Sequence, residues 1–113
     1  MENIIFNELK LRGFNVDVGV VEYNYNDSEG KSRRSKLEVD FIANLGSKKF
    51  YIQSALNIDD EQKKEQETAS LNRIDDSFSK IVVVKDNIEP WQDDKGIQYI
   101  GIEQFLLEED WLR

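Results

Sequence analysis

An apolar alternation that runs into the dipeptide Gly46-Ser47 is the feature that most constrains this fold. In residues 36–44 apolar side chains recur at every second position, which is the period of a β-strand, and residues 48–56 follow as a second strand. A two-residue Gly-Ser turn favours an antiparallel hairpin. In that register paired residue numbers add up to 93, so Asp40 is predicted to lie opposite Gln53.

The same register places Glu38 opposite Ala55 and Ile42 opposite Tyr51. The alternation puts Glu38, Asp40 and Ile42 on one face of the strand and Leu37, Val39, Phe41 and Ala43 on the other.

Before this hairpin, the sequence predicts a helix, a strand and a loop. Residues 2–13 favour a helix that ends at Gly13, where a left-handed cap is expected. Residues 14–25 alternate with a change of phase, which predicts a strand with a bulge near Gly19. The polar residues 26–35 are predicted to form a loop.

After the hairpin, residues 59–74 predict a largely polar surface helix. The apolar residues 81–84 are typical of a strand buried on both faces, and residues 97–102 predict a further strand after a connection at 90–96. Residues 103–112 predict a closing amphipathic helix.

This order predicts one mixed α/β domain over residues 1–113, with a central mixed sheet flanked by helices. The first predicted helix starts at the beginning of the chain with no capping residue before it, so the chain is expected to be the C-terminal fragment of a longer protein.

The sequence contains no cysteine and no histidine. This excludes disulfides, thiol nucleophiles, Ser-His-Asp triads, and zinc or haem sites that need imidazole or thiolate ligands. Any bound metal must be held by oxygen, which favours Mg²⁺, Mn²⁺ or Ca²⁺. No apolar run is long enough to span a membrane, so we expect a cytoplasmic protein with no membrane partner.

The net charge of −8 lies in residues 58–113, because acids and bases are equal in number over residues 1–57. This distribution argues against general nucleic-acid binding. One compact basic cluster could still bind the phosphates of DNA, or it could be only a solvated loop. It consists of Lys31, Arg33, Arg34 and Lys36.

The hairpin register predicts a candidate site. Asp40 and Gln53 would present oxygen atoms side by side, and Glu2 lies on the same side of the first helix as Ile5, Phe6 and Leu9. A divalent cation would stabilise a carboxylate in the middle of a sheet, although a solvated strand face would explain the same pattern.

These segments, taken in order, resemble a known superfamily. The spacing from Glu2 through Val39-Asp40 to Ile52-Gln53-Ser54-Ala55, in a helix-strand-strand-strand-helix-strand frame, resembles the PD-(D/E)XK nucleases, especially archaeal Holliday-junction resolvases. The segments ENIIFNELKLRGF, EVDFI and FYIQSAL also resemble the C-terminal domain that follows the ATPase module in an uncharacterised family of prokaryotic AAA-type ATPases.

The resemblance implies a restriction-endonuclease-like αβββαβ core and a Mg²⁺ or Mn²⁺ site. It gives Glu2 and Asp40 the roles of metal-binding acids and Ser54 that of a backbone carbonyl ligand. Gln53 stands where the family has an acid, and Ala55 stands where it has the catalytic lysine. These two departures predict weakened or absent cleavage.

Three functions follow as expectations. The first is an accessory domain, attached to an N-terminal ATPase module, that binds, assembles or regulates without cleaving DNA. The second is an active metal-dependent DNA nuclease in which Lys36 replaces the missing lysine beside Glu2, Asp40 and Gln53. The third is a protein-protein interaction module.

Overall fold

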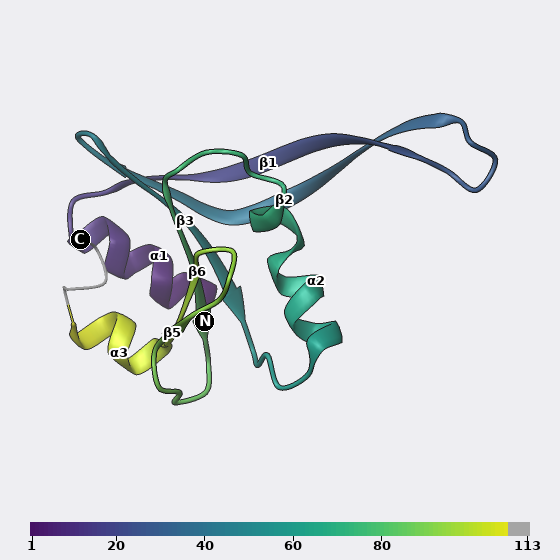
Figure 1. The fold of residues 1–113 in the computed structure, drawn as a ribbon. Helices are drawn as coiled ribbons and strands as arrows, with labels where there is room; N and C mark the ends of the chain where they lie inside the picture. The colour runs from purple at the N-terminus through teal and green to yellow at the C-terminus, as the bar shows by residue number, and fades with distance from the viewer. Residues whose placement is uncertain (109–113) are drawn as a thin grey trace.

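The computed structural model describes residues 1–108, which form a six-stranded mixed sheet with helices on both faces (Figure 1). The strand order is β1-β2-β3-β4-β6-β5, with β3, β4 and β6 parallel and the other neighbours antiparallel. The predicted mixed α/β architecture is confirmed. In chain order the elements are α1 (Glu2–Leu11), β1 (Asn15–Asn26), β2 (Ser32–Leu45), β3 (Lys48–Ala55), α2 (Glu61–Asn72), β4 (Ser79–Val84), β5 (Trp91–Gln92), β6 (Ile97–Gly101) and α3 (Ile102–Leu107).

Two hydrophobic cores lie on opposite faces of the sheet. On one face α1 and α3 cover the strands through fully buried side chains such as Leu9 and Phe105. On the other face α2 packs through Leu71 against Val82 and Tyr99. Figure 1 shows the same arrangement, with α1 and α3 together on one side of β3 and α2 on the other.

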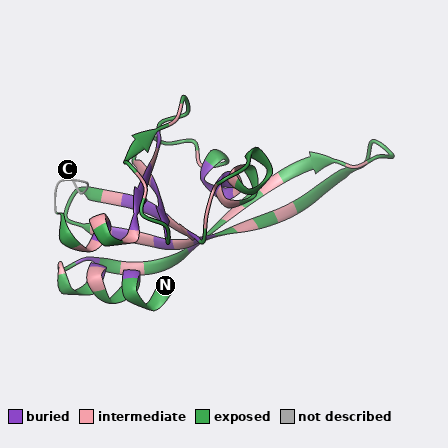
Figure 2. Cartoon of the chain, turned by 90° about the horizontal axis from the view of Figure 1, so that it is seen from below, coloured by how far each residue is buried: buried purple, intermediate pink, exposed green. Residues whose placement is uncertain are grey.

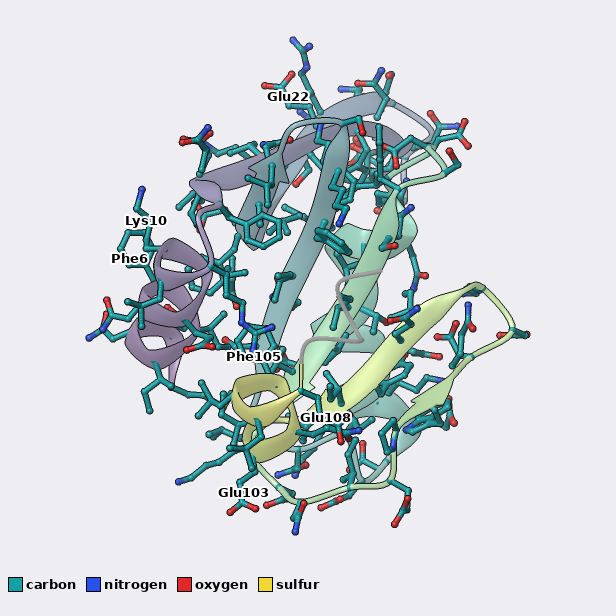
Figure 3. All side chains as sticks on the ribbon, turned by 90° about the vertical axis from the view of Figure 1, so that its left-hand side faces the viewer. Phe6, Lys10, Glu22, Glu103, Phe105 and Glu108 are labelled. Carbon is teal, nitrogen blue, oxygen red and sulfur yellow. The ribbon has the colours of Figure 1, made fainter. Side chains whose placement is uncertain are left out.

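The first helix ends as the sequence predicts. Gly13 adopts a positive φ of 90°, and its N–H and that of Phe14 return to the carbonyls of Lys10 and Leu9. Just before it, Arg12 donates to the backbone carbonyl of Phe105, which ties α1 to α3. Figure 3 shows Phe105 on the side of α3 toward α1, whereas Glu103 points away.

Strands β1 and β2 continue beyond the body of the protein as a two-stranded arm, which is largely exposed (Figures 1 and 2). Their pairing reaches Asn26 and Ser32, so the predicted loop over 26–35 is wrong and only residues 27–31 connect the strands. The arm buries neither face, and residues 32–36 therefore lack the apolar alternation by which a strand is recognised.

The ladder between β1 and β2 is irregular at one point, where Val18 of β1 faces both Asp40 and Phe41 of β2. The irregularity therefore lies next to Gly19, as predicted, but the extra residue is in β2 and not in β1. Val39 belongs to the core under α2, and Phe41 to the core under α1. The single apolar face predicted for β2 is wrong because the bulge shifts the alternation at Asp40.

The second half of the chain follows the prediction with one difference. Helix α2 begins after Asp60, whose side chain accepts a hydrogen bond from the Lys63 N–H, and all four apolar residues 81–84 of β4 are buried. The predicted connection at 90–96 contains a short strand, β5, in which the Trp91 ring stacks on Tyr99 with a 4.1 Å centroid separation.

Of the predicted closing helix over 103–112, residues 103–107 belong to α3, Glu108 is extended and ends the helix, and residues 109–112 lie outside the described residues. Within residues 1–108, none of the helices has the length and apolar character required to cross a membrane.

Candidate functional site where β2 and β3 separate

A pocket of about 560 Å³ opens among the start of α1, the strands β2 and β3, and α2. All four predicted site residues, Glu2, Asp40, Gln53 and Ser54, line it. The structure therefore brings together side chains that are far apart in the sequence. The remaining lining residues are Met1, Asn3, Ala55, Leu56 and Glu67.

The pocket forms because the backbone ladder between β2 and β3 ends early. The predicted register holds from the turn as far as Phe41 and Ile52. At the next position the Asp40 N–H donates 3.1 Å to the side-chain Oε1 of Gln53, instead of to a backbone carbonyl. The ladder ends before Glu38, so its predicted pairing with Ala55 does not form.

Asp40 and Ser54 form a compact hydrogen-bonded pair. Asp40 Oδ2 accepts the Ser54 N–H at 2.9 Å and lies 2.8 Å from Ser54 Oγ. Glu2 Oε1 lies 3.5 Å from the same Oγ. A hydroxyl carries one hydrogen, and the shorter distance assigns it to Asp40. Glu2 therefore lies beside the Asp40–Ser54 pair, and the Ser54 hydroxyl donates to Asp40 and not to Glu2.

Glu67 on α2 is a pocket residue that the sequence reasoning missed. Its pKa is raised, first because burial disfavours the charged carboxylate and second because the negative charge of Asp40 is nearby. Helical spacing supplied a signal for it: Glu67 precedes the buried Leu71 by four residues, so both lie on the inner side of α2.

No lysine or arginine lines this pocket among the described residues. Lys36 lies instead on the arm, where it faces Glu22 of β1 and lines a separate pocket with Arg34. The proposed replacement of the family's lysine by Lys36 thus has no geometric support. At Ala55, where that lysine would stand, the side chain is buried in the core under α2.

The donor set suits a divalent metal poorly. Over residues 1–108, no three acidic side chains are grouped so that they could hold one ion. The amide oxygen of Gln53 already accepts the Asp40 N–H, and Asp40 Oδ2 already accepts two hydrogen bonds from Ser54. A metal ion that binds here would share these oxygens with the hydrogen bonds and would gain only a neutral ligand from Gln53.

The predicted basic cluster lies on the arm and is largely paired with acids. The pKa of Asp27 is lowered, chiefly by its hydrogen bond from Arg33. A phosphate would have to compete with ion pairs that already involve both arginines and Lys31. These pairs are Arg33 with Asp27 at 2.8 Å, Arg34 with Glu22 at 3.0 Å, and Lys31 with Glu29 at 3.9 Å.

Comparison with known proteins gives one informative similarity. The chain is 34% identical over 108 residues to an uncharacterised protein of Haemophilus influenzae, covering 96% of this chain and 23% of that relative. This chain therefore spans about a quarter of the relative's length. No family model matches the chain. No solved structure matches it either.

Proposed function

We propose that this chain is a nuclease-like domain of the PD-(D/E)XK type that has lost phosphodiester cleavage and serves binding, assembly or regulation within a longer ATPase-containing protein. The observation that carries the proposal is the hydrogen bond from the Asp40 N–H to Gln53 Oε1, which engages within the protein the side chain that stands where the nucleases have a metal-binding acid. The αβββαβ order of the first elements supports such a core, and the greater length of the relative supports a larger parent protein.

The loss of cleavage follows from what the chemistry requires. Metal-assisted phosphodiester hydrolysis needs a cation that polarises the phosphate and lowers the pKa of an attacking water. Gln53 provides no negative charge, and Ala55 provides no ammonium group to position water or balance charge. Each missing transition-state contact would raise the barrier by about 3 kcal/mol, or roughly a hundredfold in rate.

A cleavage assay tests this proposal directly. Linear and branched DNA is incubated with the purified chain in Mg²⁺ or Mn²⁺, next to the Asp40→Asn variant. We expect both proteins to leave the DNA intact. Metal-dependent cutting by the wild-type chain that Asp40→Asn abolishes would show that the domain is an active nuclease.

The charge distribution favours a second candidate, a protein-protein interaction module without a nucleic-acid ligand. The pocket is lined by three acids, Glu2, Asp40 and Glu67, and the arm pairs its arginines with its own carboxylates. For this candidate we expect no DNA mobility shift even at low salt, together with stable association with the ATPase module. A salt-sensitive shift lost on substitution of Arg33 and Arg34 would exclude it.

A further inference from the structure

The strand β1 forms one edge of the sheet, and no strand pairs with its outer side within residues 1–108. Its 12 residues, Asn15–Asn26, extend over roughly 40 Å at about 3.4 Å per residue, whereas the longest dimension of the protein is 49 Å. Figure 1 shows that much of this length belongs to the arm. Backbone N–H and C=O groups on the outer side of such a strand are available to pair with another strand.

The two edges of the sheet differ in how they are protected. At the far edge β5 has only 2 residues and follows Pro90, which cannot donate a hydrogen bond. By contrast, β1 contains no lysine, arginine or proline. One of its two acids, Glu22, is paired with Arg34 of β2 at 3.0 Å. Short length, proline and lysine commonly block edge pairing, so the composition of β1 favours a strand that accepts a partner.

Two valines of β1 expose apolar surface along this edge. The side chains of Val18 and Val20 are on residues that are 66% and 53% exposed. Their spacing puts them on the same face of β1 as Val16, which packs against the core under α1. A second strand beside β1 would cover both valines with side chains of the same face and would remove apolar surface from water.

The charges of β1 favour antiparallel pairing of two identical strands. In a parallel pair in register, Asp17 and Glu22 would each lie beside its own copy, which is unfavourable. An antiparallel pair centred on Val20 places Asp17 opposite Tyr23 and Glu22 opposite Val18, so no two acids face each other. One sequence thus fits both sides of the pairing, which argues for a second copy of this chain as the partner.

We propose that β1 pairs with β1 of a second copy of this chain, antiparallel and centred on Val20, so that the two sheets become continuous. This orientation lays the arm of each copy beside the start of β1 in the other copy, and it puts the two bodies at opposite ends of the pair (Figure 1). The pairing uses no residue of the pocket at Asp40. It therefore stands independently of the proposed function and goes beyond it.

Sedimentation equilibrium of the 113-residue chain over a range of concentrations measures this association. We expect a monomer–dimer equilibrium that Val20→Lys and Val20→Glu each weaken by at least about tenfold, because two like charges would face each other with their Cβ atoms about 5 Å apart. Mixing the two variants should restore the dimer, because lysine then faces glutamate. Leu107→Lys and Leu107→Glu are the matched controls at a position 83% exposed on α3, and each should dimerise as the wild-type chain does.

Cysteine substitution tests the register, since the chain has no cysteine of its own. We expect mild oxidation to link Val20→Cys into a disulfide dimer and to leave Tyr25→Cys unlinked, because Tyr25 would lie opposite Asn15. The proposal is overturned if the wild-type chain stays monomeric at millimolar concentration, if the Val20 variants dimerise as well as the Leu107 variants, or if Tyr25→Cys is linked and Val20→Cys is not. Circular dichroism of each variant verifies that it is folded.

Discussion

Asp40 joins two strands at the point where their backbone ladder stops. Its N–H binds the side chain of Gln53, and its carboxylate accepts both hydrogen bonds from Ser54. In a working metal site a carboxylate is available for the ion, and its removal often leaves stability unchanged or improved. In this protein the Asp40 carboxylate accepts two hydrogen bonds that hold the fold together. The change in the free energy of unfolding when Asp40 is replaced therefore distinguishes a structural role from a metal-binding role.

We therefore expect Asp40→Ala to lower the free energy of unfolding by about 2 kcal/mol, because it leaves the half-buried Ser54 N–H without its acceptor. Urea denaturation followed by circular dichroism measures this change. Glu2→Ala is the control, with an expected change within about 0.5 kcal/mol because Glu2 is exposed and only approaches Ser54. An Asp40→Ala variant more stable than wild type would contradict this structural role.

Tyr51 gives the protein a measurable response to alkaline pH. Burial, and then the hydrogen bond to Asp76, raise the pKa of Tyr51 to about 12. Between pH 10 and 12 the unfolded chain loses this proton while the folded chain keeps it, so stability falls as pH rises. Burial and Asp93 also raise the pKa of Tyr99, which adds to the effect.

Each of these tyrosines should contribute a slope of up to about −1.4 kcal/mol per pH unit in this window. We expect Tyr51→Phe to reduce the slope by about half and the exposed Tyr25→Phe to leave it unchanged. Denaturant unfolding at several pH values from 9 to 12 supplies the measurement. Equal slopes in wild type and Tyr51→Phe would disprove the assignment.

At the scale of elements, the bulge in β2 determines which side chains reach the pocket. Opposite this region, Gly19 is buried, and a Cβ there would lie 2.6 Å from Ile42 Cδ1 and 3.3 Å from Val39 Cβ. The absence of a side chain at Gly19 lets β1 approach the bulged strand closely. The bulge in β2 and the close contact at Gly19 of β1 thus occur at the same point of the paired strands.

Gly19→Ala should destabilise the protein by about 1–3 kcal/mol, because the added methyl group overpacks this contact. The neighbouring Val20→Thr substitution, at a position 53% exposed, should change stability by less than about 0.5 kcal/mol. Thermal and urea unfolding of the two variants make the comparison. If Gly19→Ala were as stable as Val20→Thr, the close approach of β1 to Ile42 would be refuted.

The elements that the sequence predicts well are those with strong local signals. Gly46-Ser47 determines the hairpin register as far as Phe41, and Gly13 marks the end of α1. Within β2 the bulge has no such signal, because Val39 and Phe41 keep an unbroken apolar alternation although they enter opposite cores, and only the change of phase in β1 indicates an irregularity near Gly19. The arm was missed for a related reason, since polar strands that bury neither face resemble a loop.

At the scale of the whole molecule, the candidate site depends on contacts between distant segments. The hairpin register predicted that Asp40 and Gln53 would be neighbours, and the phase of the first helix predicted the approach of Glu2. Nothing local indicated that Gln53 Oε1 would replace a backbone acceptor, or that α2 would place Glu67 at the pocket. These features follow from the separation of β2 and β3 and from the packing of both sheet faces.

Calorimetric titration with Mn²⁺ tests the central claim most directly, namely that Gln53, Asp40 and Ser54 satisfy one another and leave no metal site. Gln53→Glu keeps a side-chain acceptor for the Asp40 N–H and adds the negative charge that Gln53 lacks, and Gln98→Glu adds the same charge elsewhere. The account predicts no saturable binding at millimolar Mn²⁺ by the wild-type chain or Gln98→Glu, and a gain of binding in Gln53→Glu. Stoichiometric Mn²⁺ binding by the wild-type chain that Asp40→Asn abolishes would contradict it.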